Sequence, residues 1–296
     1  MNFFKRFGFM IALNILIMVT ITVILNVFNI QPYLGKFGIN YSSLMIYCLL
    51  WGFGGSFISL LLSKFMAKKM MGVEVIDPNT MSSPDQMWLV QTVHRLAQHA
   101  NLPKLPEVGI YEGDEMNAFA TGPSKSNSLV AVSSGILYKM NKTELEGVLA
   151  HEVAHIANGD MVTMTLVQGM VNAFGMFLAR IAGHFLSTLV DEEKAPMVRM
   201  IATIILDIVF NILGMFLVAY VSRRREFRAD AGGASLGGRE KMIAALQKLQ
   251  HETAPLLEEK SPVATMQISN RRGGFLALLS THPDLQDRID RLKMAV

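Results

Sequence analysis

The sequence predicts a mainly α-helical integral membrane protein with about four transmembrane helices and a cytoplasmic α+β domain. Hydrophobic residues make up 51% of the 296 residues. They gather in long uncharged runs that alternate with polar stretches, and basic residues flank the runs. An apolar run of about 20 residues is long enough to cross the hydrocarbon layer of a bilayer as a helix.

Residues 1–64 are expected to form two N-terminal transmembrane helices. Phe7–Phe28 and Tyr41–Ser63 contain no charged residue, and a long helix that is apolar all round has no face suited to water. The first run resembles a signal peptide, but its apolar part is too long and no small-residue cleavage site precedes the second run. We therefore interpret it as a retained anchor.

Basic residues predict the orientation of these spans. Lys5 and Arg6 precede the first run, and Lys64, Lys68 and Lys69 follow the second. Because cytoplasmic flanks are enriched in Lys and Arg, the N-terminus and the chain after the second run are expected in the cytoplasm. These flanks largely explain the small basic excess, 27 Lys and Arg against 24 Asp and Glu, so the charge gives no case for nucleic acid binding.

Residues 65–160 have a soluble character and are expected to combine helices with strands. A helix is predicted to open at residues 83–85, and Asn141 with Glu144 three residues later is typical of a capping box at the start of another helix. Short runs bounded by turn residues predict three strands, Glu107–Tyr111, Ala118–Thr121 and Leu129–Val132.

Residues 161–221 are expected to form a second hydrophobic hairpin. The runs Met161–Ala179 and Val198–Tyr220 are long but include polar residues such as Asp207. A buried hairpin in a soluble domain is therefore the alternative to a third and fourth membrane span, which length favours. Residues 222–296 are expected to complete the cytoplasmic part with further helices, at Arg239–Leu249 and Pro283–Met294.

The segment HEVAH at residues 151–155 carries the strongest chemical signal. Residues four apart share one face of an α-helix, so His151 and His155 can reach one ion. Glu152 lies about 100° farther round the helix, where it suits a general base better than a ligand. The only cysteine, Cys48, lies in a predicted span, so any zinc must be held by His and carboxylate. This helix is expected to continue into the third span.

A catalytic zinc site needs a third protein ligand and one open position. Glu226 and Asp230, in the segment EFRAD after the second hairpin, are again four residues apart. An even number of spans between the two segments would return them to the same side of the membrane. Asp230 would then accept a hydrogen bond from a ligand imidazole. The alternative is an exposed helix whose carboxylates pair with the neighbouring arginines.

HEVAH, then EFRAD after a hydrophobic hairpin, with two N-terminal spans, resembles the HtpX family of bacterial membrane zinc metalloproteases, which are related to the CAAX prenyl endopeptidases. NAFATG at 117–122, HIANGD at 155–160 and THPDLQDRI at 281–289 are also similar to that family. The resemblance implies a zincin-like metalloprotease domain with one Zn²⁺ per chain. It implies the ligands His151, His155 and Glu226, with Glu152 as general base.

The same resemblance implies three further features. His282 is expected near the zinc as an oxyanion donor, with packing at a helix N-terminus as its alternative role. The expected substrate-binding edge strand is Asn117, Ala118, Phe119, Ala120 and Thr121. Quality control of misfolded or damaged membrane proteins in a bacterial inner membrane under stress is the implied setting.

The predicted function is therefore zinc-dependent endopeptidase activity on membrane-protein or unfolded polypeptide substrates at the cytoplasmic membrane face. A prenyl-protein-type peptidase is one alternative, although four spans are few for a lipid-sized chamber. A membrane transporter or scaffold with a vestigial metal site is another, with Asp207 and Arg180 as its working residues. The lipid bilayer is an expected partner, and a homo-oligomer is left open.

Overall fold

A computed structural model describes residues 34–35, 38–78, 83–256 and 280–294. The first predicted span, Phe7–Phe28, lies outside these residues. The chain divides into two compact units, one from residues 1–60 and 164–218, the other from residues 61–163 and 219–296.

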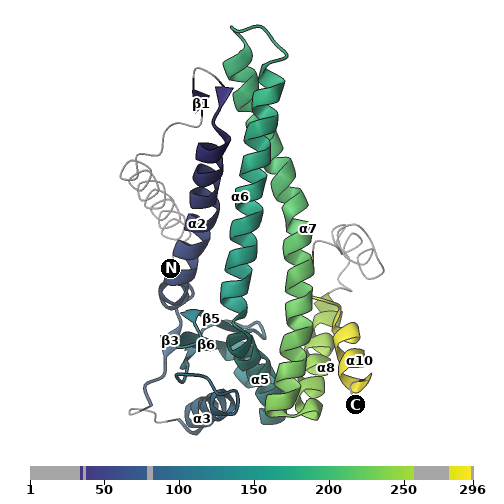
Figure 1. The fold of residues 1–296 in the computed structure, drawn as a ribbon. Helices are drawn as coiled ribbons and strands as arrows, with labels where there is room; N and C mark the ends of the chain where they lie inside the picture. Colours follow the sequence, from purple (N-terminus) through teal and green to yellow (C-terminus); the bar gives the residue numbers. More distant parts are fainter. Residues whose placement is uncertain (1–33, 36–37, 79–82, 257–279, 295–296) are drawn as a thin grey trace. The chain divides into compact units, whose positions relative to one another are not determined.

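The first unit consists mainly of long helices (Figure 1). They are parts of α2 (Tyr41–Met70), α6 (Asp160–Ser187) and α7 (Ala195–Gly237), preceded by the short hairpin of β1 (Leu34–Gly35) and β2 (Gly38–Ile39). Among the described residues, these three helices are long and apolar enough to cross a membrane, and they correspond to the second, third and fourth predicted spans.

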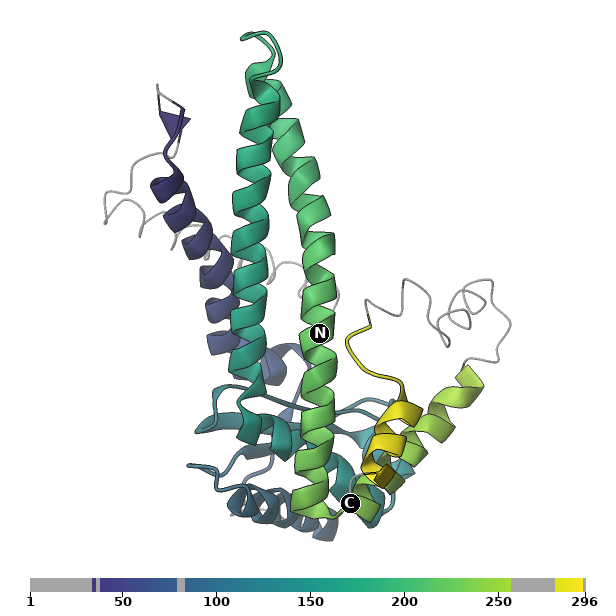
Figure 2. The same cartoon turned by 45° about the vertical axis from the view of Figure 1, so that its right-hand side comes forward.

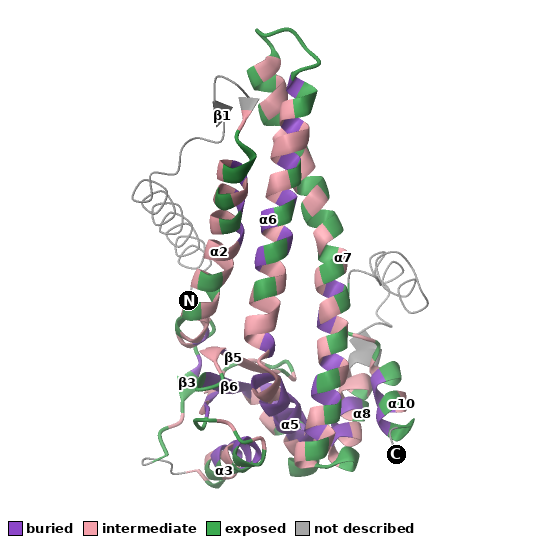
Figure 3. Ribbon diagram, viewed as in Figure 1, coloured by how far each residue is buried: buried purple, intermediate pink, exposed green. Residues whose placement is uncertain are grey.

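The most apolar window of α7 has a mean hydropathy of 2.4, and none of its residues is buried within the protein. Exposed and half-buried residues accordingly cover this part of α7 in Figure 3. Such a surface is unfavourable in water and suits lipid. Within the hairpin Arg180 and Asp207 form an ion pair, with Arg180 Nη1 3.7 Å from Asp207 Oδ2.

The second unit contains a four-stranded sheet with the order β3-β4-β6-β5. β4 and β6 are parallel and the other two pairs are antiparallel. The central strand β6 is apolar and almost wholly buried, whereas β5 has a strand on only one side among the described residues. The strands are β3 (Glu74–Val75), β4 (Glu107–Tyr111), β5 (Ala118–Ser124) and β6 (Asn127–Ser133). The sequence predicted all of these except β3, with shorter bounds for β5 and β6.

Helices complete the second unit around a core that joins α3, β6 and α5. Leu89 and Leu96 of α3 meet Val130 of β6 and Leu149 of α5 in this core. α10 packs beside α8, as Figures 1 and 2 both show. The helices are α3 (Pro84–His99), α4 (Ser134–Lys139), α5 (Lys142–Asn158), α8 (Arg239–Leu256) and α10 (Leu285–Met294).

The ends of α5 place the HEVAH segment. At its start the predicted capping box is present, because the Asn141 side chain accepts from the backbone of Glu144 and the Glu144 side chain accepts from Asn141. At its end Gly159 adopts φ 72°, a left-handed conformation that glycine adopts without steric cost. The expectation of one helix running from His151 into the third span is therefore wrong, since α6 starts as a separate helix at Asp160.

Candidate metal centre

Two imidazoles of α5 face each other within the second unit. His151 and His155 are both buried, and their Nε2 atoms are 3.0 Å apart. Their ring planes are nearly perpendicular, at 85°. The one-turn spacing of the HEVAH segment thus brings two nitrogen donors to one point.

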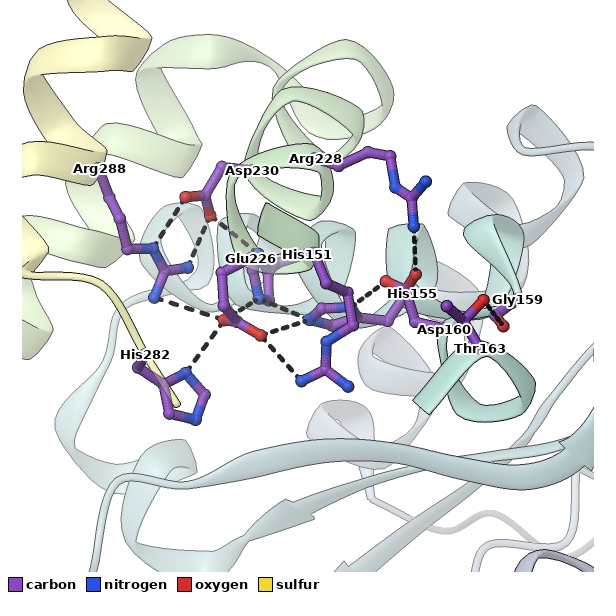
Figure 4. Close-up of polar contacts among 11 residues, drawn as sticks. His151, His155, Gly159, Asp160, Thr163, Glu226, Arg228, Asp230, His282 and Arg288 are labelled. Carbon is purple, nitrogen blue, oxygen red and sulfur yellow. Dashed lines mark hydrogen bonds and ion pairs between the residues drawn. The ribbon is translucent and has the colours of Figure 1, made fainter. Parts of the chain in front are cut away.

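Glu226 of α7 brings a carboxylate to the same point. Its Oε2 lies 3.5 Å from His151 Nε2 and its Oε1 lies 3.5 Å from His155 Nε2 (Figure 4). The residue is only 2% exposed. α7 can approach α5 this closely because Gly233 lies against it, where an added Cβ would be 3.0 Å from the His151 backbone nitrogen.

These three donors fit a metal ion. One ligand atom from each of His151, His155 and Glu226 lies within 4.8 Å of the other two. A tetrahedral zinc with bonds of about 2.0–2.1 Å separates its ligand atoms by about 3.3 Å, close to the observed distances. Two buried nitrogens facing each other and one carboxylate is a donor set typical of catalytic zinc sites.

A buried carboxylate lies behind His151. Asp230 Oδ1 is 3.0 Å from His151 Nδ1, although the pair does not meet hydrogen-bond geometry. Arg288 of α10 holds the same carboxylate with two hydrogen bonds, 2.8 Å from Nε to Oδ2 and 2.6 Å from Nη2 to Oδ1. Burial alone would raise the pKa of Asp230, but Arg288 and His151 hold it below its usual value.

A second carboxylate lies behind His155. Asp160 Oδ2 is 2.6 Å from His155 Nδ1, and Asp160 Oδ1 accepts from Arg228 Nη2 at 2.9 Å. Helix periodicity did not predict a role in the site for Asp160, Arg228 or Arg288. Each imidazole therefore has one carboxylate beside its Nδ1, and each of these two carboxylates is held by one arginine, as Figure 4 shows.

Two further side chains contact Glu226. His282 Nδ1 lies 3.1 Å from Glu226 Oε2, and Arg225 Nη2 donates to Glu226 Oε1 at 3.0 Å. The side chain of His282 is 64% exposed, so a substrate could reach it. Burial alone would raise the pKa of Glu226, but contacts with His151 and His282 hold it well below its usual range.

Burial and ion contacts also act in opposite directions on the pKa of His151. Burial alone would lower the pKa of this imidazole, but its contacts with Asp230 and Glu226 raise the pKa to about 9. The negative charge of Glu152 acts in the same direction as a lesser cause. Glu152 is half-buried and follows His151 on α5.

The predicted substrate strand lies at one edge of the described sheet. β5 covers Ala118–Thr121 and continues to Ser124, whereas Asn117 precedes the strand. Asn117 is fixed through its backbone, which exchanges hydrogen bonds with the backbone and side chain of Ser133. β5 also packs against α5, the helix that carries both histidines.

Residues 83–296 match the model of peptidase family M48. The chain belongs to this family. Relatives named Protease HtpX homolog are similar over nearly their whole length: the Bacillus subtilis protein is 51% identical and the Bacillus licheniformis protein 50%, each over 98% of this chain and 99% of the relative. Protease HtpX of Acinetobacter baumannii is 46% identical over 97% of both chains.

A solved structure has a similar fold. The crystal structure of S. mikatae Ste24p matches with a TM-score of 0.65 and 17% identity, over 98% of this chain. This chain spans 64% of the length of that protein. The M48 family and these relatives identify the chain as a metalloprotease, and its long apolar helices identify it as a membrane protein. The resemblance stated from the sequence is therefore confirmed, and so is the predicted fold class.

Proposed function

We propose that the chain is a zinc-dependent endopeptidase that cleaves unfolded or damaged membrane proteins at the cytoplasmic face of a bacterial inner membrane. The observation that carries the proposal is the convergence of His151, His155 and Glu226 within 4.8 Å. These three residues would hold one Zn²⁺ per chain and leave a fourth position open.

Zinc bound there would polarise the scissile carbonyl and lower the pKa of water at the open position. Glu152 would accept the proton of the attacking water and deliver it to the leaving amine. His282 would donate a hydrogen bond to the developing oxyanion, and its exposure beside Glu226 supports that role. Asp230 would fix the orientation of His151 through Nδ1.

The substrate would bind as an extended strand along Asn117–Thr121. Among the described residues β5 pairs with β6 alone, which supports this, because the edge of a strand offers backbone donors and acceptors to another chain. Backbone pairing gives affinity without requiring one particular sequence. An enzyme of this kind suits varied, damaged polypeptides.

The proposed layout follows the charge bias of the sequence. Residues 1–64 would form two N-terminal transmembrane helices and residues 161–221 a transmembrane hairpin. Residues 65–160 and 222–296 would form the cytoplasmic catalytic part, whose site residues all belong to one compact unit. Lys68 and Lys69 after α2's apolar run and Arg223–Arg225 after α7's support a cytoplasmic side for this part.

The test is a Glu152→Gln variant of the full-length protein in detergent or nanodiscs. It should keep about one zinc per chain, because no ligand changes. Hydrolysis of an unfolded membrane protein should fall by about 10²–10⁴-fold, because the base is lost. Zinc content is measured by atomic absorption, and chelator followed by zinc should abolish and restore wild-type cleavage. Cleavage by the variant at the wild-type rate would disprove the role of Glu152, and a faster reaction on a farnesylated peptide would favour a prenyl-protein peptidase.

A further inference from the structure

A basic pocket lies on the second unit, between α7 and α10. Its volume is about 510 Å³. Five residues line it, three arginines and two aromatic residues: Tyr220, Arg223, Arg224, Phe227 and Arg291.

The spacing of the α7 residues explains the shape of the pocket. Residues 220, 223, 224 and 227 follow the spacing of one helical face, and Arg291 of α10 faces them. The guanidinium of Arg224 lies 5.2 Å from the ring centre of Tyr220, and that of Arg291 lies 3.9 Å from the ring centre of Phe227. Each aromatic ring thus holds one arginine in place.

Two arginines of this pocket are not neutralised within the described part of the chain. Arg225 and Arg228, on other sides of α7, pair with Glu226 and Asp160. Arg224 and Arg291 have no ion pair with any described carboxylate, and both are exposed. A stacked guanidinium keeps its N–H edge available, which suits an anion with several oxygens.

The position of the pocket along α7 indicates which kind of anion it would bind. The apolar run of α7 ends just before Arg223, and the helix continues without a break to Gly237. Tyr220 to Phe227 therefore cover about 10 Å of helix directly after a candidate membrane span. Tyrosine and arginine are the side chains that meet lipid headgroups at this depth.

We propose that this pocket binds the phosphate headgroup of an anionic phospholipid, with Arg224 and Arg291 as the phosphate donors. The aromatic residues would contact the glycerol and upper acyl region. A free phosphate shares the charge chemistry but would gain nothing from Tyr220 and Phe227, so the lipid is the better fit.

Headgroup binding would also bear on the catalytic part, an extension that rests on the proposed function. Arg291 lies three residues after Arg288, which holds Asp230 behind His151. Arg223 Nη1 donates to the backbone oxygen of Ser280 at 2.7 Å, two residues before His282. A lipid that joins Arg224 to Arg291 would fasten α10 to α7 and stabilise both elements.

The experiment measures lipid binding directly, so it stands apart from any failure of the protease assignment. Full-length protein in a neutral detergent is titrated with short-chain phosphatidylglycerol, phosphatidylcholine or inorganic phosphate, and binding is followed by native mass spectrometry and thermal shift. Arg224→Gln and Arg291→Gln should each weaken phosphatidylglycerol binding about 5-fold, since one arginine near a charged surface contributes on that order. Arg95→Gln, which changes an exposed arginine of α3 outside this pocket, should leave binding unchanged.

Several outcomes would overturn the proposal. Equal binding of phosphatidylglycerol and phosphatidylcholine would show that the pocket does not select an anion. Equal losses in Arg95→Gln and Arg224→Gln would show that only net charge matters. Inorganic phosphate that competes as strongly as phosphatidylglycerol would assign the pocket to a free anion. Arg224→Lys should bind at an intermediate level, because lysine keeps the charge but loses the planar donor edge.

Discussion

The two histidines of the candidate metal centre are held by their neighbours in different ways. Behind His151, Asp230 and Arg288 come from α7 and α10, and Arg288 is only 6% exposed. Behind His155, Asp160 lies five residues along the chain, and the Arg228 side chain that binds it is 57% exposed. Both supports join three helices, but the one behind His151 is buried throughout, whereas the one behind His155 ends at a solvated arginine.

This difference predicts unequal sensitivity to mutation. A buried ion pair that loses one partner leaves an uncompensated charge, which costs about 3–5 kcal/mol. An exposed arginine can be replaced by water and salt at a cost of about 0–1 kcal/mol. The His151 support should therefore couple zinc binding to the stability of the domain, and the His155 support should act on zinc binding alone.

The largest effect is expected from mutation of Glu226, which lies beside both histidines. Glu226→Gln should lower zinc affinity by more than about 100-fold and abolish cleavage, because an amide is a poorer ligand and two histidines alone make a weak site. Zinc stoichiometry and cleavage are measured across a zinc titration. Full occupancy with normal cleavage would move the third ligand elsewhere, with His282 as the nearest candidate.

The next largest effects are expected from mutation of the two carboxylates behind the histidines, Asp230 and Asp160. Asp230→Asn and Asp160→Asn should each weaken zinc binding by about 10–100-fold, and excess zinc should restore part of the activity. Only Asp230→Asn should also lower the thermal stability of the metal-free protein strongly, because it leaves Arg288 buried without a full counter-charge. Equal losses of stability in both variants would remove the distinction between the two supports.

Mutation of the two arginines, Arg288 and Arg228, tests the same difference between the buried and the solvated support. Arg288→Gln should destabilise the domain by about 3–5 kcal/mol and weaken zinc binding several-fold, since it leaves the Asp230 carboxylate buried beside His151 alone. Arg228→Gln, the matched control, should cost less than Arg288→Gln, because Arg228 is 57% exposed and water can replace its charge, although Asp160 stays buried beside His155. Denaturant unfolding of the metal-free proteins measures both. A larger effect at Arg228 would reverse the assignment of the buried and solvated supports.

Local patterns predicted the parts of this site that depend on helix periodicity. Four-residue spacing placed His151 with His155 and Glu226 with Asp230 on common faces, and the apolar runs correspond to α2, α6 and α7. These features depend on neighbours along one helix, which a sequence displays directly.

Other parts depend on geometry that no local pattern displays. The Asp230–Arg288 pair joins residues that are 58 apart in sequence, so the sequence around either residue does not predict the other as its partner. Asp160 reaches back to His155 only because Gly159 turns the chain with a positive φ, which also separates α5 from α6. A glycine and a carboxylate directly after the histidine helix were the available signals, and the segment HIANGD contains both.

The smallest expected effect is a change in the number of protons that the protein releases when it binds zinc. In the metal-free protein His151 has a pKa raised to about 9, because its contacts with Asp230 and Glu226 outweigh the effect of burial. A raised folded pKa stabilises the fold fully below the ordinary value of about 6.5, and this contribution is lost as the pH rises through the folded value. At pH 7.5 zinc must therefore displace a proton from His151, since only the neutral imidazole can bind the metal.

Calorimetry of zinc uptake in buffers of different ionisation enthalpy measures the protons released. Asp230→Asn should release a fraction of a proton less per zinc than the wild type, because its His151 loses one of the two contacts that raise the pKa. Arg228→Gln touches neither Asp230 nor His151 and should release as many protons as the wild type. If Asp230→Asn also matched the wild type, the contact between Asp230 and His151 would not control the protonation of that imidazole, and the buried support would act through packing instead.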